Sequence, residues 1–160
     1  PSIGNKLINA RSETADQKPS FRQAYSKQRC LIPATGFFEW NKKGDKQPWY
    51  FYLPDFPVFS FAGLWDIWKD GEGRSVFSFT ILTTHANSIM KDIHHRMPVI
   101  LTPEQEKQWL DVSKEIPSGF PELPHDIPME KYKVYTIVNK PENDFPGVIE
   151  PQKSSGTLFD

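Results

Sequence analysis

The chain is organised as short apolar segments separated by clusters of Gly, Pro, Asn and Asp. Within residues 76–83, Val76 and Ser78 fall on one side of an extended backbone, and Phe77 and Phe79 fall on the other. Aromatic residues, which form 14% of the chain, favour strands over helices. We therefore expect strands at residues 6–10, 29–33, 36–40, 49–53, 58–65, 76–83 and 132–138.

Two helices are expected among these strands. One covers about residues 86–92. The second starts after Thr102, because Pro103 suits a first helical position and Gln105 completes a capping box, and it should turn Trp109 and Leu110 toward the core. Strands dominate and do not alternate with helices. The predicted fold class is therefore α+β and mainly β, an antiparallel sheet or barrel with a few peripheral helices.

The length of 160 residues predicts one domain. We assign it to residues 1–140 and expect residues 141–160 to be a loose tail that Phe145 and Phe159 could fasten. Residues 113–131 contain four prolines without periodicity and should form a long loop. The first residue is Pro1 rather than Met, so we expect either a processed terminus or a longer protein whose front is absent.

Charge and cysteine content restrict the classes of site. The net charge of −1 gives no overall attraction to nucleic acid, so an anion site must be a local cluster. The single cysteine, Cys30, lies in an apolar run and is expected to be a buried structural thiol. No apolar run reaches the length of a membrane span, and residues 1–6 have no signal-peptide core. We expect a cytoplasmic protein without membrane partners.

Glu39 lies between Phe38 and Trp40 in residues 36–40. In a strand its side chain points away from both rings. If that side faces a cleft, the carboxyl group is suited to exchange protons with a substrate. The alternative is an ordinary solvated acid.

A polar cluster at residues 92–98 reads Asp-Ile-His-His-Arg-Met-Pro. His94 and His95 should point apart on an extended backbone, so that one serves a site as a general acid or base, or simply packs against the sheet. The other histidines, His85 and His125, complete no metal-binding pattern with them. We expect neither a metal nor a cofactor.

Residues 9–14 read Asn-Ala-Arg-Ser-Glu-Thr. Arg11 and Arg96 could form a forked clamp for phosphates. They could equally form salt bridges with Glu13 and Asp92. The amide of Asn9 can donate and accept hydrogen bonds, which suits it to orient a sugar.

Residues 9–14, 29–40 and 93–101 together resemble the SOS-response-associated peptidase (SRAP) domain, and the resemblance extends over about residues 7–140. It implies a sensor of abasic sites in single-stranded DNA that forms a DNA–protein cross-link through an N-terminal cysteine. It also implies catalytic roles for Glu39, His94 and Asn9. Arg11 and Arg96 match the arginines that hold flanking phosphates.

The chain departs from this family pattern because it has no Met-Cys start. Cys30 has no free α-amine, so we expect this chain alone to form no stable adduct. Two alternatives follow, a noncovalent single-stranded-DNA-binding module and an autoprocessing cysteine-type peptidase. In each case we expect a monomer, which would associate with the nucleoid when bound to damaged DNA.

Overall fold

The computed structural model describes residues 7–41, 44–116, 120 and 128–153. The elements in chain order are β1 (Asn9–Arg11), α1 (Ser12–Ala15), α2 (Arg22–Lys27), β2 (Arg29–Ala34), β3 (Phe37–Trp40), β4 (Pro48–Tyr52), β5 (Phe59–Lys69), β6 (Ser75–His85), β7 (Arg96–Pro98), β8 (Ile100–Leu101), α3 (Pro103–Leu110), β9 (Glu130–Lys133) and the 3₁₀ helices η2 (Thr136–Asn139) and η3 (Pro146–Ile149). The mainly β class with few helices is confirmed.

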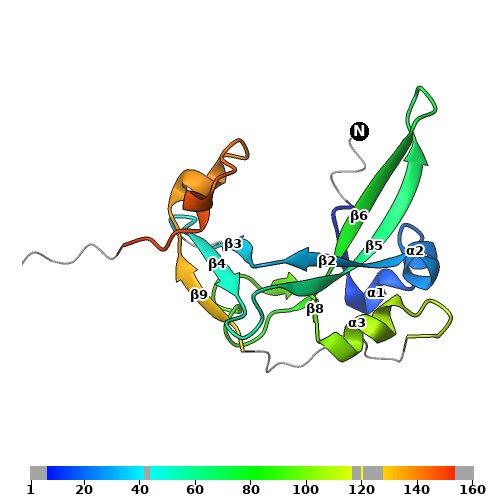
Figure 1. The fold of residues 1–160 in the computed structure, drawn as a ribbon, viewed down its shortest axis with the longest axis horizontal. Coiled ribbons are helices and arrows are strands. Elements are labelled where there is room, and N and C mark those ends of the chain that lie inside the picture. Colours follow the sequence, from blue (N-terminus) through cyan, green and yellow to red (C-terminus); the bar gives the residue numbers. More distant parts are fainter. Residues whose placement is uncertain (1–6, 42–43, 117–119, 121–127, 154–160) are drawn as a thin grey trace, which may run out of the picture.

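The larger sheet, sheet A, has the strand order β1-β6-β5-β2. β7 pairs with β6, and β8 pairs with β5. All of these pairs are antiparallel except β1 with β6, which is parallel. The β5–β6 hairpin extends beyond the other strands as a long twisted ribbon (Figure 1).

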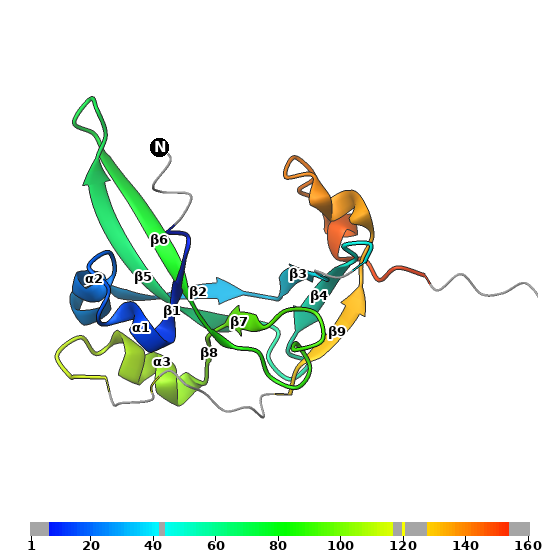
Figure 2. The same ribbon diagram turned by 180° about the vertical axis from the view of Figure 1, so that it is seen from behind.

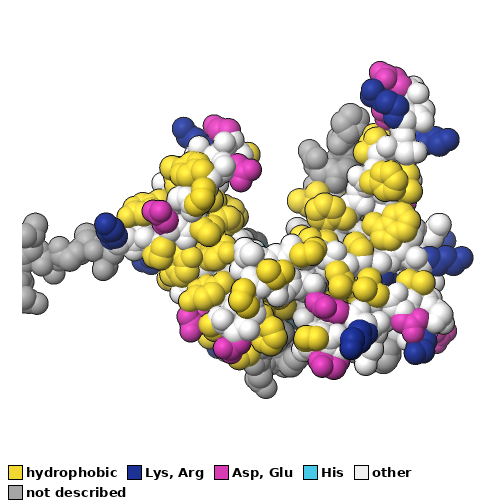
Figure 3. All heavy atoms as spheres, in the orientation of Figure 1, with side chains coloured by type: hydrophobic (Ala, Val, Ile, Leu, Met, Phe, Trp, Pro, Cys, Tyr) yellow, Lys and Arg dark blue, Asp and Glu magenta, His cyan; other side chains and the backbone are white. Residues whose placement is uncertain are grey.

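The smaller sheet, sheet B, has the order β3-β4-β9 and is antiparallel. Sheet B with the 3₁₀ helices forms one arm of the molecule, and the β5–β6 hairpin forms the other (Figure 1, and from behind in Figure 2). The space-filling view shows a deep notch between the two arms, with charged side chains gathered at the tip of the hairpin (Figure 3).

Side chains alternate between the two faces of sheet A, and each face packs against its own hydrophobic core. One face, covered by the helices, buries Ala10, Leu64 and Leu82. The other face, which meets sheet B, buries Phe61 and Ile100 together with side chains of β4. Because neighbouring side chains alternate between the faces, a residue next to a helix-side core residue points toward sheet B.

The helix α3 begins as expected. The Thr102 side chain accepts a hydrogen bond from the Gln105 backbone, and the Gln105 side chain accepts one from the Thr102 backbone. Trp109 on this helix is fully buried, whereas Leu110 is 47% exposed, so the prediction for Leu110 is wrong. Neighbouring residues of an α-helix point about 100° apart around its axis, so Leu110 points away from the core when Trp109 points into it.

Two predicted elements differ in the structure, and several short elements were not predicted. Residues 86–92 form successive turns rather than a helix, because the side chain of Asn87 accepts hydrogen bonds from the backbone of Ile89 and Met90. The last strand ends at Lys133, and after Val134 the chain enters η2. The short elements α1, α2, β7 and β8 were not predicted.

The described part of the expected tail is held against sheet B. Val134 forms a β-bridge with Pro151, and the Tyr132 hydroxyl donates to the carbonyl of Ile149 over 2.8 Å. Phe159 and His125 lie outside the described residues. Among the helices that the structure describes, none is long and apolar enough to cross a membrane.

Candidate functional site

Glu39 and His94 face each other across the junction of sheet B with the turn that precedes β7. Glu39 Oε1 lies 4.0 Å from His94 Nδ1. The two side chains retain 25% and 16% of their exposure, so both are partly shielded and still reachable from solvent. A carboxylate and an imidazole at this distance can pass protons to and from a bound substrate.

Backbone groups fix the imidazole ring of His94. Its Nδ1 lies 2.9 Å from the carbonyl oxygen of Arg96 and 3.2 Å from the amide nitrogen of the same residue. The carbonyl accepts a hydrogen bond when Nδ1 carries the proton, and the amide N–H donates one when Nδ1 does not. In the first tautomer the lone pair of Nε2 can accept a proton. The orientation of His94 therefore depends on the position of Arg96.

Arg96 is held by an ion pair inside the protein. Its two terminal nitrogens donate to Glu13 over 2.6 and 2.9 Å, and one of them also donates to the carbonyl of Thr83 over 2.5 Å. The Arg96 side chain is only 11% exposed. Of the salt bridges considered from the sequence, the one between Arg96 and Glu13 forms. A bidentate pair of this kind fixes both the position and the orientation of the guanidinium group.

Opposing influences act on Glu13. Burial raises the pKa of this carboxyl. The hydrogen bond from Arg96, a backbone hydrogen bond and the positive charge of Arg96 together outweigh burial, and the net pKa lies below the usual 4.5. His85 adds a weaker interaction, with its Nε2 3.6 Å from Glu13, although its side chain is 79% exposed. The sequence indicates Glu13 only as a possible salt-bridge partner, yet its bond to Arg96 connects α1 to β7, the strand that directly follows the turn with His94.

Replacing Glu13 by Gln should lower the free energy of unfolding at pH 7 by about 2–3 kcal/mol, because Arg96 would keep a buried charge without its partner. The lowered pKa means that the pair stabilises the fold above pH 4.5 and that this stabilisation is lost as the pH falls through the folded-state pKa. The difference between wild type and variant, measured by denaturant unfolding at several pH values, should therefore shrink below pH 4.5.

The matched control is Glu72→Gln. Glu72 pairs with Arg74 at the hairpin tip, where both side chains are more than two thirds exposed. An exposed ion pair contributes little to the free energy of unfolding. Equal losses in the two variants would contradict the role given to Glu13.

Asn9 and Arg11 lie on the face of sheet A that meets sheet B. Ala10 between them is buried on the helix side opposite Leu82, so its two neighbours point the other way. Both Asn9 and Arg11 are exposed. Arg11 therefore remains accessible to an anion, whereas the guanidinium of Arg96 is already engaged. A phosphate clamp formed by both arginines stays a prediction.

The two adjacent histidines do not point apart. The rings of His94 and His95 lie with their centroids 4.6 Å apart, tilted by 43°. They precede β7 rather than extending it, so the alternation expected of a strand does not apply to them. Among the described residues, no three His, Cys, Asp or Glu side chains gather in a way that could hold a metal ion.

Cys30 is partly buried in β2, and burial raises the pKa of its thiol. A raised pKa lowers the thiolate fraction and therefore the nucleophilicity. The partial burial of Cys30 and the raised pKa of its thiol therefore favour a structural role over a reactive one.

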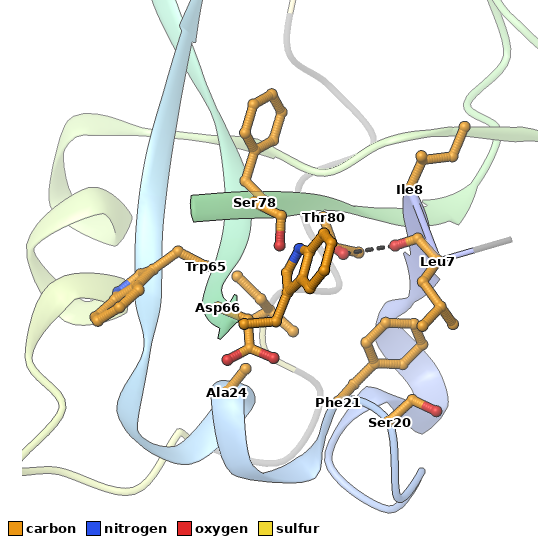
Figure 4. Close-up of a pocket in the computed structure, with 12 residues that line it drawn as sticks. Leu7, Ile8, Ser20, Phe21, Ala24, Trp65, Asp66, Ser78 and Thr80 are labelled. Atoms are coloured by element: carbon orange, nitrogen blue, oxygen red, sulfur yellow. Dashed lines mark hydrogen bonds between the residues drawn. The ribbon is translucent and has the colours of Figure 1, made fainter. Parts of the chain in front are cut away.

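A cavity of about 580 Å³ lies elsewhere, between α2 and the β5–β6 hairpin (Figure 4). Phe21 and Ala24 line it from the α2 side, and Asp66 and Thr80 line it from the hairpin. The Thr80 hydroxyl donates to the carbonyl of Leu7 over 2.6 Å. Glu39 and His94 do not line this cavity, so it is separate from the candidate site.

Several known proteins resemble this chain. The abasic site processing protein YoqW of Bacillus subtilis is 45% identical over 153 residues, covering 92% of this chain and 68% of that protein. The abasic site processing protein HMCES of Xenopus tropicalis is 31% identical, covering 96% of this chain and 53% of that protein. The chain thus spans about two thirds of the bacterial relative and about half of the vertebrate one.

A solved structure shares the fold. A protein from Bacteroides thetaiotaomicron superposes with a TM-score of 0.81 at 38% sequence identity, covering 93% of this chain and 67% of that one. The model of the SOS response associated peptidase (SRAP) family matches residues 1–141. The chain therefore belongs to the SRAP family.

Proposed function

We propose that this protein processes abasic sites in single-stranded DNA, and that Glu39 and His94 are its proton-transfer pair. The observation that carries the proposal is the 4.0 Å approach of the two side chains at a partly exposed position. The names of the relatives from Bacillus subtilis and Xenopus tropicalis support abasic DNA as the substrate.

The proposed reaction is condensation of an amine with the aldehyde of a ring-opened abasic sugar. The amine nitrogen bonds to the aldehyde carbon, a proton leaves nitrogen, and the carbinolamine oxygen departs as water when it is protonated. A thiol on the same residue then adds to the imine carbon and closes a thiazolidine ring. Glu39 protonates the departing oxygen, and His94 receives protons through Nε2.

Other residues on this side of the molecule would position the strand. The amide of Asn9 can hydrogen-bond the open sugar, and the exposed guanidinium of Arg11 can bind a flanking phosphate. Both project from β1 toward the side on which sheet B lies, because Ala10 occupies the helix side. A charge pattern of this local kind suits a chain whose net charge is only −1.

The amine and thiol are proposed to come from a terminal cysteine outside these 160 residues. The sequence contains one cysteine, Cys30, and its nitrogen is in a peptide bond within β2. Cys30 can therefore supply a thiol but no amine.

The complete protein should form a covalent adduct with an abasic single strand and none with the same strand carrying an intact base. Denaturing gel electrophoresis and intact mass measurement would detect the adduct. Salt-sensitive binding without an adduct would favour a noncovalent binder instead. Release of a terminal residue without any effect of DNA would favour an autoprocessing peptidase.

A further inference from the structure

The face of sheet B that carries Glu39 continues as a row across all three of its strands. Glu39 in β3 is opposite Trp49 in β4, and Trp49 is opposite Lys133 in β9. Register partners in an antiparallel sheet project from the same face. Lys133 therefore lies on the same face as Glu39, two strands away, or roughly 10 Å.

Trp49 holds two ammonium groups over its ring. Lys131 Nζ lies 5.3 Å from the indole centroid, and Lys133 Nζ lies 5.6 Å from it. These distances are typical of cation–π interactions. The indole is itself partly buried and packs against the core that contains Phe51, so it is a fixed support.

The two lysines differ in their remaining contacts. Lys131 donates to the carbonyl of Ile89 over 2.7 Å, which ties sheet B to the turns that lead to His94. Lys133 is exposed at the outer end of the row. Neither lysine forms an ion pair with a carboxylate in the part of the chain that the structure describes.

A charged row with this geometry suits a polyanion that passes over Glu39. Arg11 supplies a positive charge from sheet A, and Lys133 supplies one from the far strand of sheet B. A single strand whose sugar reaches Glu39 must continue past that residue. Along the row on sheet B, the positive charge lies at Lys133.

We propose that Lys133, supported by Trp49 and Lys131, is a subsite for a backbone phosphate of the strand beside the reacting sugar. This inference rests on the proposed function. Lys133 acts in binding, not in proton transfer. Its ammonium group would replace a counterion of the phosphate, which makes its contribution dependent on salt.

The test measures the Kd of the 160-residue chain for a fluorescent single strand without abasic sites, by anisotropy over a range of salt concentrations. In Lys133→Gln the slope of log Kd against log salt should decrease by about 0.7, the value for one phosphate contact on a single strand, and affinity should fall roughly fivefold at about 0.1 M salt. Lys133→Arg should keep the wild-type slope. Lys69→Gln, which removes an exposed strand lysine at the distal end of β5, should also leave the slope unchanged.

The possible results distinguish a failure of the proposed subsite from a failure of the proposed function. If Lys133→Gln binds the single strand with the wild-type slope of log Kd against log salt, the subsite is overturned and the proposed function stands. Wild type that fails to bind any single strand would overturn both. An equal decrease in Lys69→Gln would show that only overall charge matters and would also overturn the subsite.

Discussion

Replacing Glu39 by Gln in the complete protein should slow formation of the covalent adduct with an abasic single strand by about 10²–10⁴-fold. Glutamine keeps the size of the side chain but cannot deliver a proton to the departing carbinolamine oxygen. The partner imidazole of His94 stays in place, because its Nδ1 is held by backbone groups of Arg96 rather than by Glu39 alone. The measurement is a single-turnover time course of adduct formation.

Two controls separate chemistry from binding in this experiment. Affinity for an intact single strand should change by less than about twofold in Glu39→Gln, because the variant loses a negative charge but no phosphate contact. Glu130→Gln removes a carboxyl from the same sheet on its opposite face, where Glu130 accepts a hydrogen bond from the Tyr52 hydroxyl. An adduct rate in Glu39→Gln equal to that of Glu130→Gln would refute the role of Glu39.

The longer strands could be predicted from the sequence because each carries its own local signal. β5 and β6 are eleven residues each, rich in aromatic and β-branched side chains, and a turn with Gly71 and Gly73 joins them. The start of α3 was equally local, since its capping box lies within four residues. These elements are confirmed, although β5 runs to Lys69 rather than ending at Trp65.

The missed elements are short and depend on distant partners. β7 and β8 have three and two residues, and they exist because β6 and β5 supply their hydrogen bonds. The helices α1 and α2 have four and six residues, and neither has a side-chain cap. No periodic pattern can develop over such lengths.

In the candidate site, too, features that depend on local sequence could be predicted and those that depend on distant partners could not. Residue types and motifs indicated Glu39 and His94, and the structure brings them together. The partner of Arg96 was harder to predict, because Glu13 is 83 residues away and the sequence equally allowed Asp92 or a phosphate. Residue chemistry limits what a side chain can bind, but only the fold decides which partner reaches it first.

The second large effect is on stability. Trp109→Ala should lower the free energy of unfolding by about 3–5 kcal/mol. The indole is fully buried, its ring meets Tyr25 edge-on with centroids 5.5 Å apart, and its Nε1 donates to the carbonyls of Cys30 and Gly63 over 3.0 and 3.3 Å. Alanine would leave a cavity and two buried carbonyls without this donor.

The surroundings make collapse of that cavity difficult. The guanidinium of Arg29 lies 5.5 Å from the Trp109 ring centroid and donates to the carbonyls of Trp109 and Asp111 over 2.6 Å each. Those bonds hold the end of α3 against β2, so the helix cannot move inward without breaking them. Chemical denaturation would measure the loss, with Leu110→Ala on the exposed side of the same helix expected to cost less than about 1 kcal/mol. Similar losses for the two variants would mean that α3 does not anchor the sheet through Trp109.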